Sequence, residues 1–400
     1  MTNIQPTIIE TFVGAGGAHL GFKKAGFKSL LVNDIDNDTI QTLLINKVIN
    51  KNQVLLCPIE DITEEILKEK LGDLKTDILF GGIVCKGFSL AGVRNPFDNR
   101  NYLYKEQLRL VKLLKPKISI IENVVAIKTM ILYIKCDETI QIFEEYSKLS
   151  DENKLLNGEK SSKRKNGNDY SNLNLLINKN KKIMEELLKK IDKYKYNIID
   201  DIKQIYNELG YKFYEKVLQT NKYEGYTSRK RLIMVAVRND INKEYQFPEE
   251  CNSNYNLNDA LNLIDYNGIN NPEFDIDNRP MKHNKKTIER FKLIPEGNNI
   301  ANIIDDIPDE LKISAFYSRG NTQRLDRNQP VPTLVPGHSN FPIHPFENRS
   351  ITVREASTIT GFPLDYKFYG SHSSRCMQIG NAVPIQLAYH IALSIKKIII

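Results

Sequence analysis

The first third of the chain alternates short apolar runs with amphipathic stretches. After the first run, residues 18–25 predict a helix, and a second helix is expected to begin at Asp38. Strands that alternate with helices at this spacing are typical of a parallel sheet with crossover helices, so we expect an α/β fold. The apolar runs that predict strands are residues 6–13, 28–33, 54–57, 77–80 and 118–121.

A polar segment of low complexity interrupts this order at residues 132–197. Within it, the apolar residues between Ile183 and Ile191 recur at helical spacing, which predicts an exposed helical hairpin inserted into the fold. Lys and Arg outnumber Asp and Glu in the segment, but a run of charge is usually a solvated face. We therefore expect it to contribute little to recognition; an arm that contacts the phosphates of a nucleic acid is the alternative.

Regular order resumes after the insertion. A helix is predicted over residues 198–209, and Gly210 can cap its C-terminus. Two apolar runs then follow, over 211–218 and 231–237. Because they stand close together in the chain, we expect them to pair as neighbouring strands.

The last third is irregular at first and regular at its end. Residues 239–340 are rich in Asn, Asp, Pro and Gly, which predicts a loop-rich second domain. A helix is predicted over 352–360, because Thr352 and Glu355 have the spacing of a capping box. The apolar residues that begin at Pro384 indicate a final, buried helix.

Composition narrows the class of protein without naming a function. Hydrophobic residues make up 41% of the chain and charged residues 26%, as in ordinary globular proteins. The net charge of +7 permits a polyanionic partner but does not require one. The 5 cysteines lack any CxxC pair, so neither a disulfide framework nor a zinc cage is expected. No apolar run is long enough to span a membrane, and no secretory signal precedes the first strand, so a cytoplasmic protein is expected.

A glycine-rich turn lies between the first predicted strand and the first helix. Gly14, Gly16 and Gly17 let the backbone turn tightly and approach a ligand at the helix N-terminus. Asp34, about twenty residues later, ends the second strand, where a carboxylate can bind the hydroxyls of a ribose. Residues 60–62 follow the third strand, where an adenine could lie. A turn without a ligand is the plain alternative; among ligands, S-adenosylmethionine fits this spacing at least as well as NAD.

Cys85 follows the fourth predicted strand, with Gly81, Gly82 and Gly87 around it. Ligands of open α/β sheets bind at this edge, and the neighbouring cation Lys86 favours a thiolate. A buried structural cysteine is the alternative. The fifth strand ends abruptly in Glu122, which could be a helix cap or could face the same crevice. A cysteine beside an acid suggests covalent catalysis with proton transfer on an electrophilic ring.

The ordered set of these motifs resembles the C5-cytosine-specific DNA methyltransferases of bacterial restriction–modification systems. The sequence departs from the family's pattern at Ile83, Val84, Lys86 and Thr227, but Cys85 and the acidic and arginine motifs remain. The matching segments are residues 12–17, 81–89, 122–124, 227–231, 349–355, 361–363 and 378–384.

The resemblance implies a fold and a division of the chain. The family has a Rossmann-like S-adenosylmethionine-dependent methyltransferase domain, with a mixed, mostly parallel sheet and helices on both faces. It also has a smaller, loop-rich target recognition domain. By this resemblance we expect the catalytic and cofactor-binding domain over 1–240, including the insertion, the recognition domain over 241–345, and a closing segment over 346–400 that returns to the catalytic domain.

The resemblance also implies the roles of individual residues. The catalytic residues would be Cys85, Glu122, Arg229 and Arg231. S-adenosyl-L-methionine would be bound by Phe12, Gly14, Ala15, Gly16, Gly17, Asp34, Ile35, Asp61, Ile62, Leu103, Asn381 and Ala382. DNA would be contacted by Lys86, Ser89, Arg94, Arg100, Arg324 and Thr333.

In this family the Cys thiolate attacks C6 of a cytosine that has been flipped out of the duplex, and C5 then accepts the methyl group. By resemblance, Glu122 would hydrogen-bond N3 and the exocyclic amine, and Arg229 and Arg231 would bind O2. No metal is expected. Duplex DNA would be the substrate, a cognate restriction endonuclease the functional partner, and the protein a cytoplasmic, nucleoid-associated monomer that binds no membrane.

Three alternatives remain. A cytosine-5 methyltransferase that acts on tRNA shares the chemistry, but it carries a shorter recognition region. A DNA-binding relative with little or no activity shares the fold, although the intact Cys85, Glu122 and Arg229 argue against it. An NAD-dependent oxidoreductase would share only the glycine turn.

Overall fold

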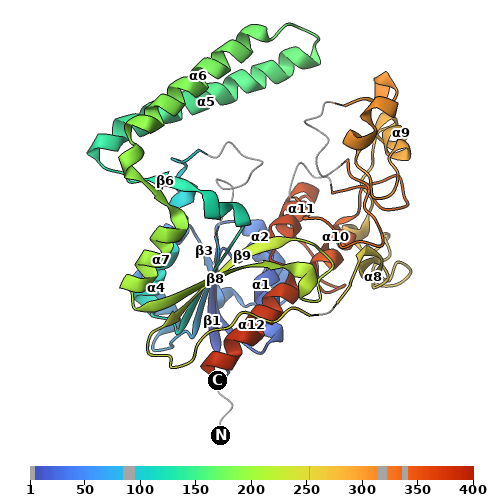
Figure 1. Cartoon of the computed structure of the whole chain (residues 1–400). Coiled ribbons are helices and arrows are strands. Elements are labelled where there is room, and N and C mark those ends of the chain that lie inside the picture. Colours follow the sequence, from blue (N-terminus) through green and yellow to red (C-terminus); the bar gives the residue numbers. More distant parts are fainter. Residues whose placement is uncertain (1–4, 84–94, 252, 314–321, 336–340) are drawn as a thin grey trace. The chain divides into compact units, whose positions relative to one another are not determined.

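The computed structural model describes residues 5–83, 95–251, 253–313, 322–335 and 341–400 (Figure 1). The chain forms two compact units. The first comprises residues 1–83, 109–123 and 210–400, and the second comprises residues 84–108 and 124–209. These limits differ from the division expected from the sequence, because residues 241–345 belong to the first unit.

One sheet of 7 strands forms the centre of the first unit, in the order β3-β2-β1-β4-β5-β9-β8 (Figure 1). The first five strands along the chain run parallel, whereas β9 pairs antiparallel with both β5 and β8. This mixed, mostly parallel sheet confirms the expected fold class. The strands are β1 (Thr7–Thr11), β2 (Lys28–Asp34), β3 (Val54–Leu56), β4 (Ile78–Gly82), β5 (Ile118–Asn123), β8 (Tyr211–Gln219) and β9 (Lys230–Arg238).

The register of the central strands brings their carboxyl ends to one edge. Thr11 at the end of β1 pairs with Asn33 of β2 on one side and with Gly81 of β4 on the other. Gly82 in turn pairs with Glu122 of β5. Loops that leave these strands therefore start from neighbouring points, which is where ligands bind in open α/β sheets.

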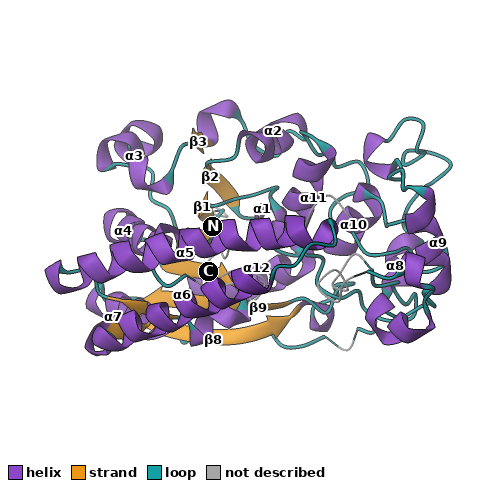
Figure 2. Cartoon of the chain, turned by 90° about the horizontal axis from the view of Figure 1, so that it is seen from above, coloured by secondary structure: helices purple, strands orange, loops and turns teal. Residues whose placement is uncertain are grey.

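The first and last helices of the chain pack together over one face of this sheet. Figures 1 and 2 show α1 (Gly17–Lys24) beside α12 (Ile385–Ile399). Phe22 of α1 and Leu387 of α12 are fully buried in one core with Ile8 of β1. A side chain at Gly17 would meet the carbonyl oxygen of Val383 at 2.1 Å, so only glycine allows α1 to approach the segment before α12 this closely.

The loop-rich stretch shares its core with the closing helices. Leu257, Val331 and Phe341 are buried together with Ala356 and Ile379. This stretch has a second small core of its own, formed by Phe291, Ile294, Ile300, Ile307, Leu311 and Ile343. The remaining helices of the first unit are α2 (Asn37–Ile45), α3 (Glu64–Leu71), α8 (Leu257–Leu261), α9 (Lys285–Leu293), α10 (Val353–Thr360) and α11 (His372–Asn381).

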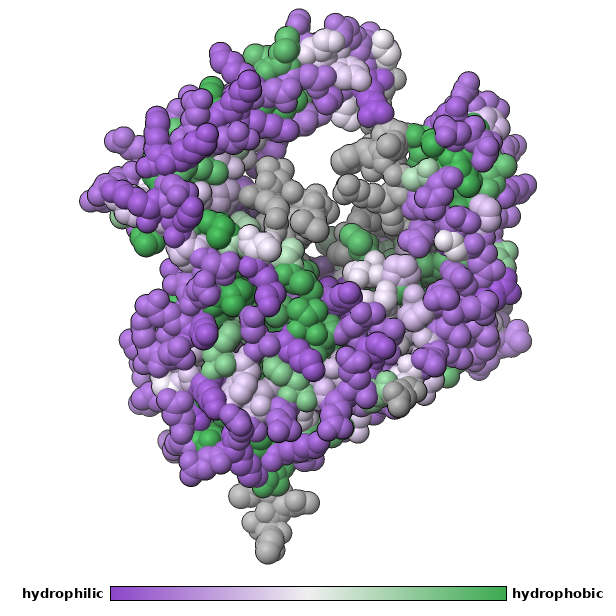
Figure 3. Space-filling view, in the orientation of Figure 1, coloured by the Kyte–Doolittle hydropathy of each residue, from purple (hydrophilic) through white to green (hydrophobic). Residues whose placement is uncertain are grey.

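The second unit contains a long helical hairpin. Its helices α5 (Asp137–Lys165) and α6 (Ser171–Lys190) confirm the predicted helical insertion. Leu155 and Leu175 are largely exposed, and Figure 3 shows only isolated hydrophobic side chains among hydrophilic ones on the hairpin. The unit also contains β6 (Ile131–Tyr133), β7 (Lys195–Asn197) and α7 (Ile198–Glu208), and it shares α4 (Leu103–Leu114) with the first unit.

The hairpin joins the rest of the second unit through aromatic packing at its base. The Phe97 ring lies 3.9 Å, centroid to centroid, from Phe143 and 5.6 Å from Tyr133. Met184 and Leu187 of α6 belong to the same buried cluster. Among the described residues, no helix combines the length and the apolar character needed to cross a membrane.

Most predicted element boundaries are confirmed within a few residues. Thr352 caps α10, and its hydroxyl and the Glu355 carboxylate form the predicted capping box. Gly210, at φ +81°, follows α7 as predicted. The last helix, predicted to begin at Pro384, runs from Ile385 to Ile399. Helix α11 was not predicted, because its polar motif residues hide the apolar periodicity.

Gly17→Ala should destabilise the protein by about 1–3 kcal/mol, because the added methyl group meets a backbone carbonyl that cannot yield easily. Gly158→Ala is the matched control. Gly158 lies within α5 with open space around it, so alanine there should stabilise the helix slightly. Thermal unfolding followed by circular dichroism measures both. A Gly17→Ala protein as stable as the wild type would contradict the close-packing argument.

Candidate active site

The glycine turn leaves β1 in a compact, left-handed conformation. Phe12, Gly14 and Gly16 have φ values of +53°, +54° and +86°. The Gly16 amide donates to the Val13 carbonyl oxygen at 3.1 Å, which closes the turn. A side chain at Gly14 would meet nothing within 4 Å, so the described residues leave open space in front of this backbone. A ligand can therefore approach the turn at Gly14.

Asp34 at the end of β2 is held against this turn. Its carboxylate accepts hydrogen bonds from the Gly14 amide at 2.9 Å and from the Asp36 amide at 3.0 Å. Burial raises the pKa of Asp34, and the amide hydrogen bonds counteract part of that rise. The carboxylate is half-buried, so it keeps acceptor capacity for hydroxyl groups of a ligand beside Gly14.

Residues from the C-terminal part of the chain support the turn from behind. The Tyr366 hydroxyl donates to the carbonyl oxygen of Ala15 at 2.8 Å, and Ala15 is fully buried. Burial raises the pKa of Tyr366, so the hydroxyl stays protonated and remains a donor. Asn381, at the end of α11, is exposed, whereas Ala382 is buried. Nothing in the sequence singled out Tyr366, because its hydrogen bond joins residues far apart in the chain.

The predicted adenine contacts follow β2 and β3. Ile35 is 69% exposed, which is unusual for isoleucine and leaves it free to pack on a ligand. Asp61 is exposed, whereas Ile62 is buried. The guanidinium of Arg109 donates to the carbonyl oxygens of Ile62 at 2.8 Å and Ile59 at 3.0 Å. Arg109, which the sequence analysis did not single out, therefore fixes the backbone that presents Asp61.

Glu122 and Arg231 form an ion pair at the same sheet edge. Arg231 Nε lies 2.7 Å from Glu122 Oε1, and each side chain is 9% exposed. The antiparallel pairing of β5 with β9 brings them together. Glu122 lies opposite Ile233, and Arg231 is two residues away from Ile233 on the same face of β9. A carboxylate and a guanidinium with little solvent around them interact strongly, so each orients the other.

Gly82 links this pair to the glycine turn. A methyl group at its Cα would stand 3.4 Å from the Phe12 carbonyl oxygen and 4.0 Å from Glu122 Oε2. The Asn123 side chain donates to the carbonyl oxygen of Ile83 at 3.2 Å, which ties the end of β4 to the end of β5. The turn and the acid thus lie on either side of the strand that leads to Cys85.

Arg229 turns toward the closing segment. It is buried, and its guanidinium donates to the carbonyl oxygens of Gly380 at 2.7 Å and Asn381 at 3.4 Å. The resemblance assigns both arginines to the base, and that role stays a prediction. Arg231 pairs directly with Glu122.

The contacts above do not include several predicted residues. Cys85, Lys86, Ser89 and Arg94 lie outside the described residues. Leu103 and Arg100 belong to the second unit, where the exposed Arg100 pairs with Asp98. Thr333 is exposed in the first unit. Within the described part of the chain, no group of His, Cys, Asp and Glu side chains has an arrangement that could hold a metal ion.

The prediction that Arg324 contacts DNA is wrong. Arg324 is 5% exposed, and its guanidinium donates to four backbone carbonyl oxygens and one side chain. Every donor is thereby directed inward, where these acceptors satisfy the buried guanidinium. The acceptors are the carbonyl oxygens of Phe291, Ile294, His344 and Glu347 and Asn348 Oδ1, at 2.6–2.9 Å.

Arg324→Ala should lower stability by at least about 3 kcal/mol, because several buried carbonyl groups lose their donors. Arg327→Ala is the control. Arg327 pairs with Glu296 at the surface, and exposed ion pairs contribute little. Urea denaturation compares the variants. If Arg324→Ala weakened DNA binding without changing stability, the internal role of Arg324 would be wrong.

Comparison with known proteins identifies relatives of this chain. The sequence model of the C-5 cytosine-specific DNA methylase family matches residues 6–157 and 175–397. The type II methyltransferase M.Eco47II of Escherichia coli is 29% identical over 100% of this chain and 81% of its own length. The type II methyltransferase M1.HphI of Haemophilus parahaemolyticus is 27% identical over 98% of this chain and 87% of its own.

Solved structures share the fold at low identity. A candidate DNA modification methyltransferase encoded within an Escherichia coli prophage superposes with a TM-score of 0.64 at 21% identity, over 98% of this chain and 99% of that one. The Dnmt2 methyltransferase of S. pombe gives a TM-score of 0.53 at 11% identity, over 99% and 100%. Because the family model extends over nearly the whole sequence, including the glycine turn, Glu122 and Arg231, this chain belongs to the C-5 cytosine-specific DNA methylase family.

Proposed function

We propose that this chain transfers a methyl group from S-adenosyl-L-methionine to C5 of a cytosine flipped out of duplex DNA, through a covalent bond to Cys85. The supporting observation is the position of Gly82 between the glycine turn and Glu122, three residues before Cys85. A cofactor at the turn and a cytosine at Glu122 would then meet beside β4, the strand that leads to Cys85.

The residues around the glycine turn fit this cofactor. Open space before Gly14 leaves room for a ligand against the backbone. The half-buried Asp34 carboxylate suits the hydroxyls of a ribose, and the exposed Ile35 offers apolar surface to an adenine. Asp61, held by the Arg109 contacts, is the acceptor that we assign to the adenine amine. When bound, S-adenosylmethionine supplies a methyl group already activated by its sulfonium.

The protein's own residues supply the rest of the chemistry. The Cys85 thiolate forms a bond to C6, which makes C5 electron-rich. Glu122 hydrogen-bonds N3 and the exocyclic amine and stabilises the charge that develops there. Arg231 keeps that carboxylate in place and binds O2, whereas Arg229 is a positioning residue that holds the Gly380 carbonyl. After C5 has accepted the methyl group, loss of the C5 proton and of the thiolate restores the ring.

The biological role follows from the relatives. M.Eco47II and M1.HphI are both named type II methyltransferases, so we propose that this chain is the methyltransferase of a type II restriction–modification system. Residues 241–345 would read the DNA site, because they form the loop-rich region that the family resemblance assigns to target recognition. A partner endonuclease that cuts the same site is then expected.

Cys85→Ala should abolish methylation and leave the affinity for S-adenosylmethionine nearly unchanged, because the cofactor contacts lie elsewhere. The wild-type protein should form a denaturant-stable adduct with duplex DNA that contains 5-fluorocytosine, and the variant should not. Cys251→Ala is the matched control, since Cys251 is a half-buried thiol whose pKa is raised by burial. It should retain both activity and the adduct.

Two outcomes would overturn the proposal. If the wild-type protein gave no adduct, the covalent mechanism would be wrong. If it methylated tRNA and left duplex DNA unmodified, the substrate would be wrong and the tRNA alternative correct. Sequencing methylated DNA from a host that expresses the chain identifies the target site.

Glu122→Gln should lower kcat by about 10²- to 10⁴-fold, because the amide cannot deliver a proton to the base. The dissociation constant of S-adenosylmethionine should change little. Glu244→Gln, at an exposed carboxylate paired with Lys212, is the control and should change neither quantity. Single-turnover kinetics with a DNA substrate separates the two readouts. An unchanged kcat would remove Glu122 from the catalytic residues.

A further inference from the structure

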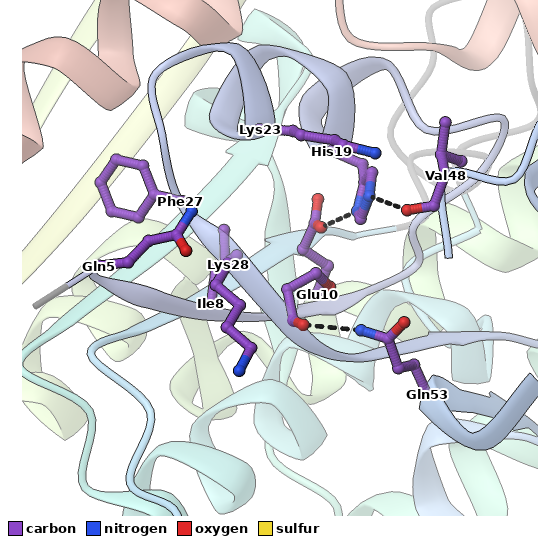
Figure 4. Close-up of a pocket in the computed structure, with 10 residues that line it drawn as sticks. Gln5, Ile8, Glu10, His19, Lys23, Phe27, Lys28, Val48 and Gln53 are labelled. Atoms are coloured by element: carbon purple, nitrogen blue, oxygen red, sulfur yellow. Dashed lines mark hydrogen bonds and ion pairs between the residues drawn. The ribbon is translucent and has the colours of Figure 1, made fainter. Parts of the chain in front are cut away.

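A cavity of about 380 Å³ lies in the first unit beside α1, and no residue assigned to the cofactor or to catalysis lines it (Figure 4). Glu10 of β1 and His19 of α1 form part of its wall, together with Lys23, Lys28, Ser29 and Gln53. The family resemblance and the proposed mechanism give neither Glu10 nor His19 a role. They are nevertheless among the most deeply buried ionisable side chains of the unit.

The two side chains form a tight ion pair. His19 Nδ1 lies 2.6 Å from Glu10 Oε2, and the side chains are 2% and 1% exposed. His19 Nε2 lies 3.3 Å from the carbonyl oxygen of Val48, which can only accept a hydrogen bond. Figure 4 shows the imidazole between these two oxygens. Nε2 therefore carries a hydrogen, and the short contact at Nδ1 holds a second proton that the pair shares.

The environment makes this shared proton important. Glu10 Oε1 is buried and has no hydrogen-bond partner among the described residues. Glu10 also lines the cavity, and a void gives the carboxylate fewer packing contacts than close-packed side chains would. Burying a carboxylate beside a neutral imidazole is costly, whereas burying it beside an imidazolium is much less so. The geometry of the pair thus depends on the proton.

The pair also brackets the whole glycine turn. Glu10 lies one residue before the end of β1, and His19 is the third residue of α1. The segment between them includes Phe12 and Gly14, the residues that face the proposed cofactor. The Val48 contact extends the same support to the segment that follows α2. We propose that Glu10 and His19 are positioning residues for the cofactor turn, and that loss of their shared proton loosens the turn and weakens cofactor binding.

This inference rests on the proposed function for its cofactor, and its sign follows from the charges around His19. Burial lowers the pKa of His19. Attraction to Glu10 and the hydrogen bonds to Glu10 and Val48 together raise it by a larger amount, so that the net pKa is raised above 6.5. Lys23, on the same helix, opposes this rise, and Lys28 of β2 lines the cavity as a second cation. The support is therefore complete below pH 6.5 and is lost as the pH rises through the raised pKa.

The test is a pH profile of cofactor affinity. Calorimetric titration of the full chain with S-adenosylmethionine should show the dissociation constant rising at least about fivefold between pH 6 and pH 9. His19→Gln keeps a donor for one oxygen but cannot hold the second proton, so its profile should be flat. Lys23→Met removes an opposing charge, so its affinity loss should move to higher pH. The pKa of Asp34 is also raised, but protonation of this carboxylate would weaken cofactor binding at the acidic end of the profile, which is the opposite direction.

A second readout does not depend on the cofactor. Amide hydrogen exchange of residues 13–17, corrected for intrinsic rates, should become faster at high pH in the free wild-type protein and stay constant in His19→Gln. Superimposable affinity profiles for wild type and His19→Gln, or exchange that is independent of pH, would overturn the inference. If His19→Gln lost affinity by the same factor at every pH, the pair would have only a structural role, and the inference would be overturned too. Failure of the wild-type protein to bind S-adenosylmethionine, with pH-dependent exchange intact, would instead refute the proposed function.

Discussion

The close approach of α1 to α12 is the constraint on which the rest of the structure depends. Gly17 and Gly21 lie where any side chain would meet the backbone or side chains of Val383 and Ala388. The first helix can therefore pack against the last, and together they cover the central strands. The glycine turn, which must stay open in front, is supported from behind by this contact and by the Tyr366 hydroxyl.

Buried charges organise the loop-rich part of the first unit. Arg354 of α10 lies 2.7 Å from Asp275, and Arg375 of α11 lies 2.7 Å from Asp277. Removing one partner of such a pair leaves a buried charge and is costly, so each pair holds the loops to the closing helices in one arrangement. Arg324 does the same for backbone carbonyl groups. In a region with few regular hydrogen-bond ladders, arginines take the place of strand partners.

How far the sequence could predict each feature depended on how local its cause is. The capping box at Thr352 and the glycine after α7 are recognisable because a few neighbouring residues create them. Glu122 could be singled out because it ends an apolar run abruptly. Arg324 was misjudged, since nothing near it in the chain reveals whether an arginine faces solvent or loop carbonyls. Arg109 and His19 were overlooked for the same reason, because their partners come from other elements.

The sequence by itself determined the strands of the central sheet, the fold class and the family, because periodicity, caps and ordered motifs are properties of short segments. Only the tertiary structure decided which side chains meet. Glu122 and Arg231 are far apart in the chain, and they form an ion pair because β5 and β9 pair antiparallel in one register. Glu10 and His19 share a proton because β1 and α1 bury both beside a cavity. Such contacts depend on packing, and packing is a property of the whole chain.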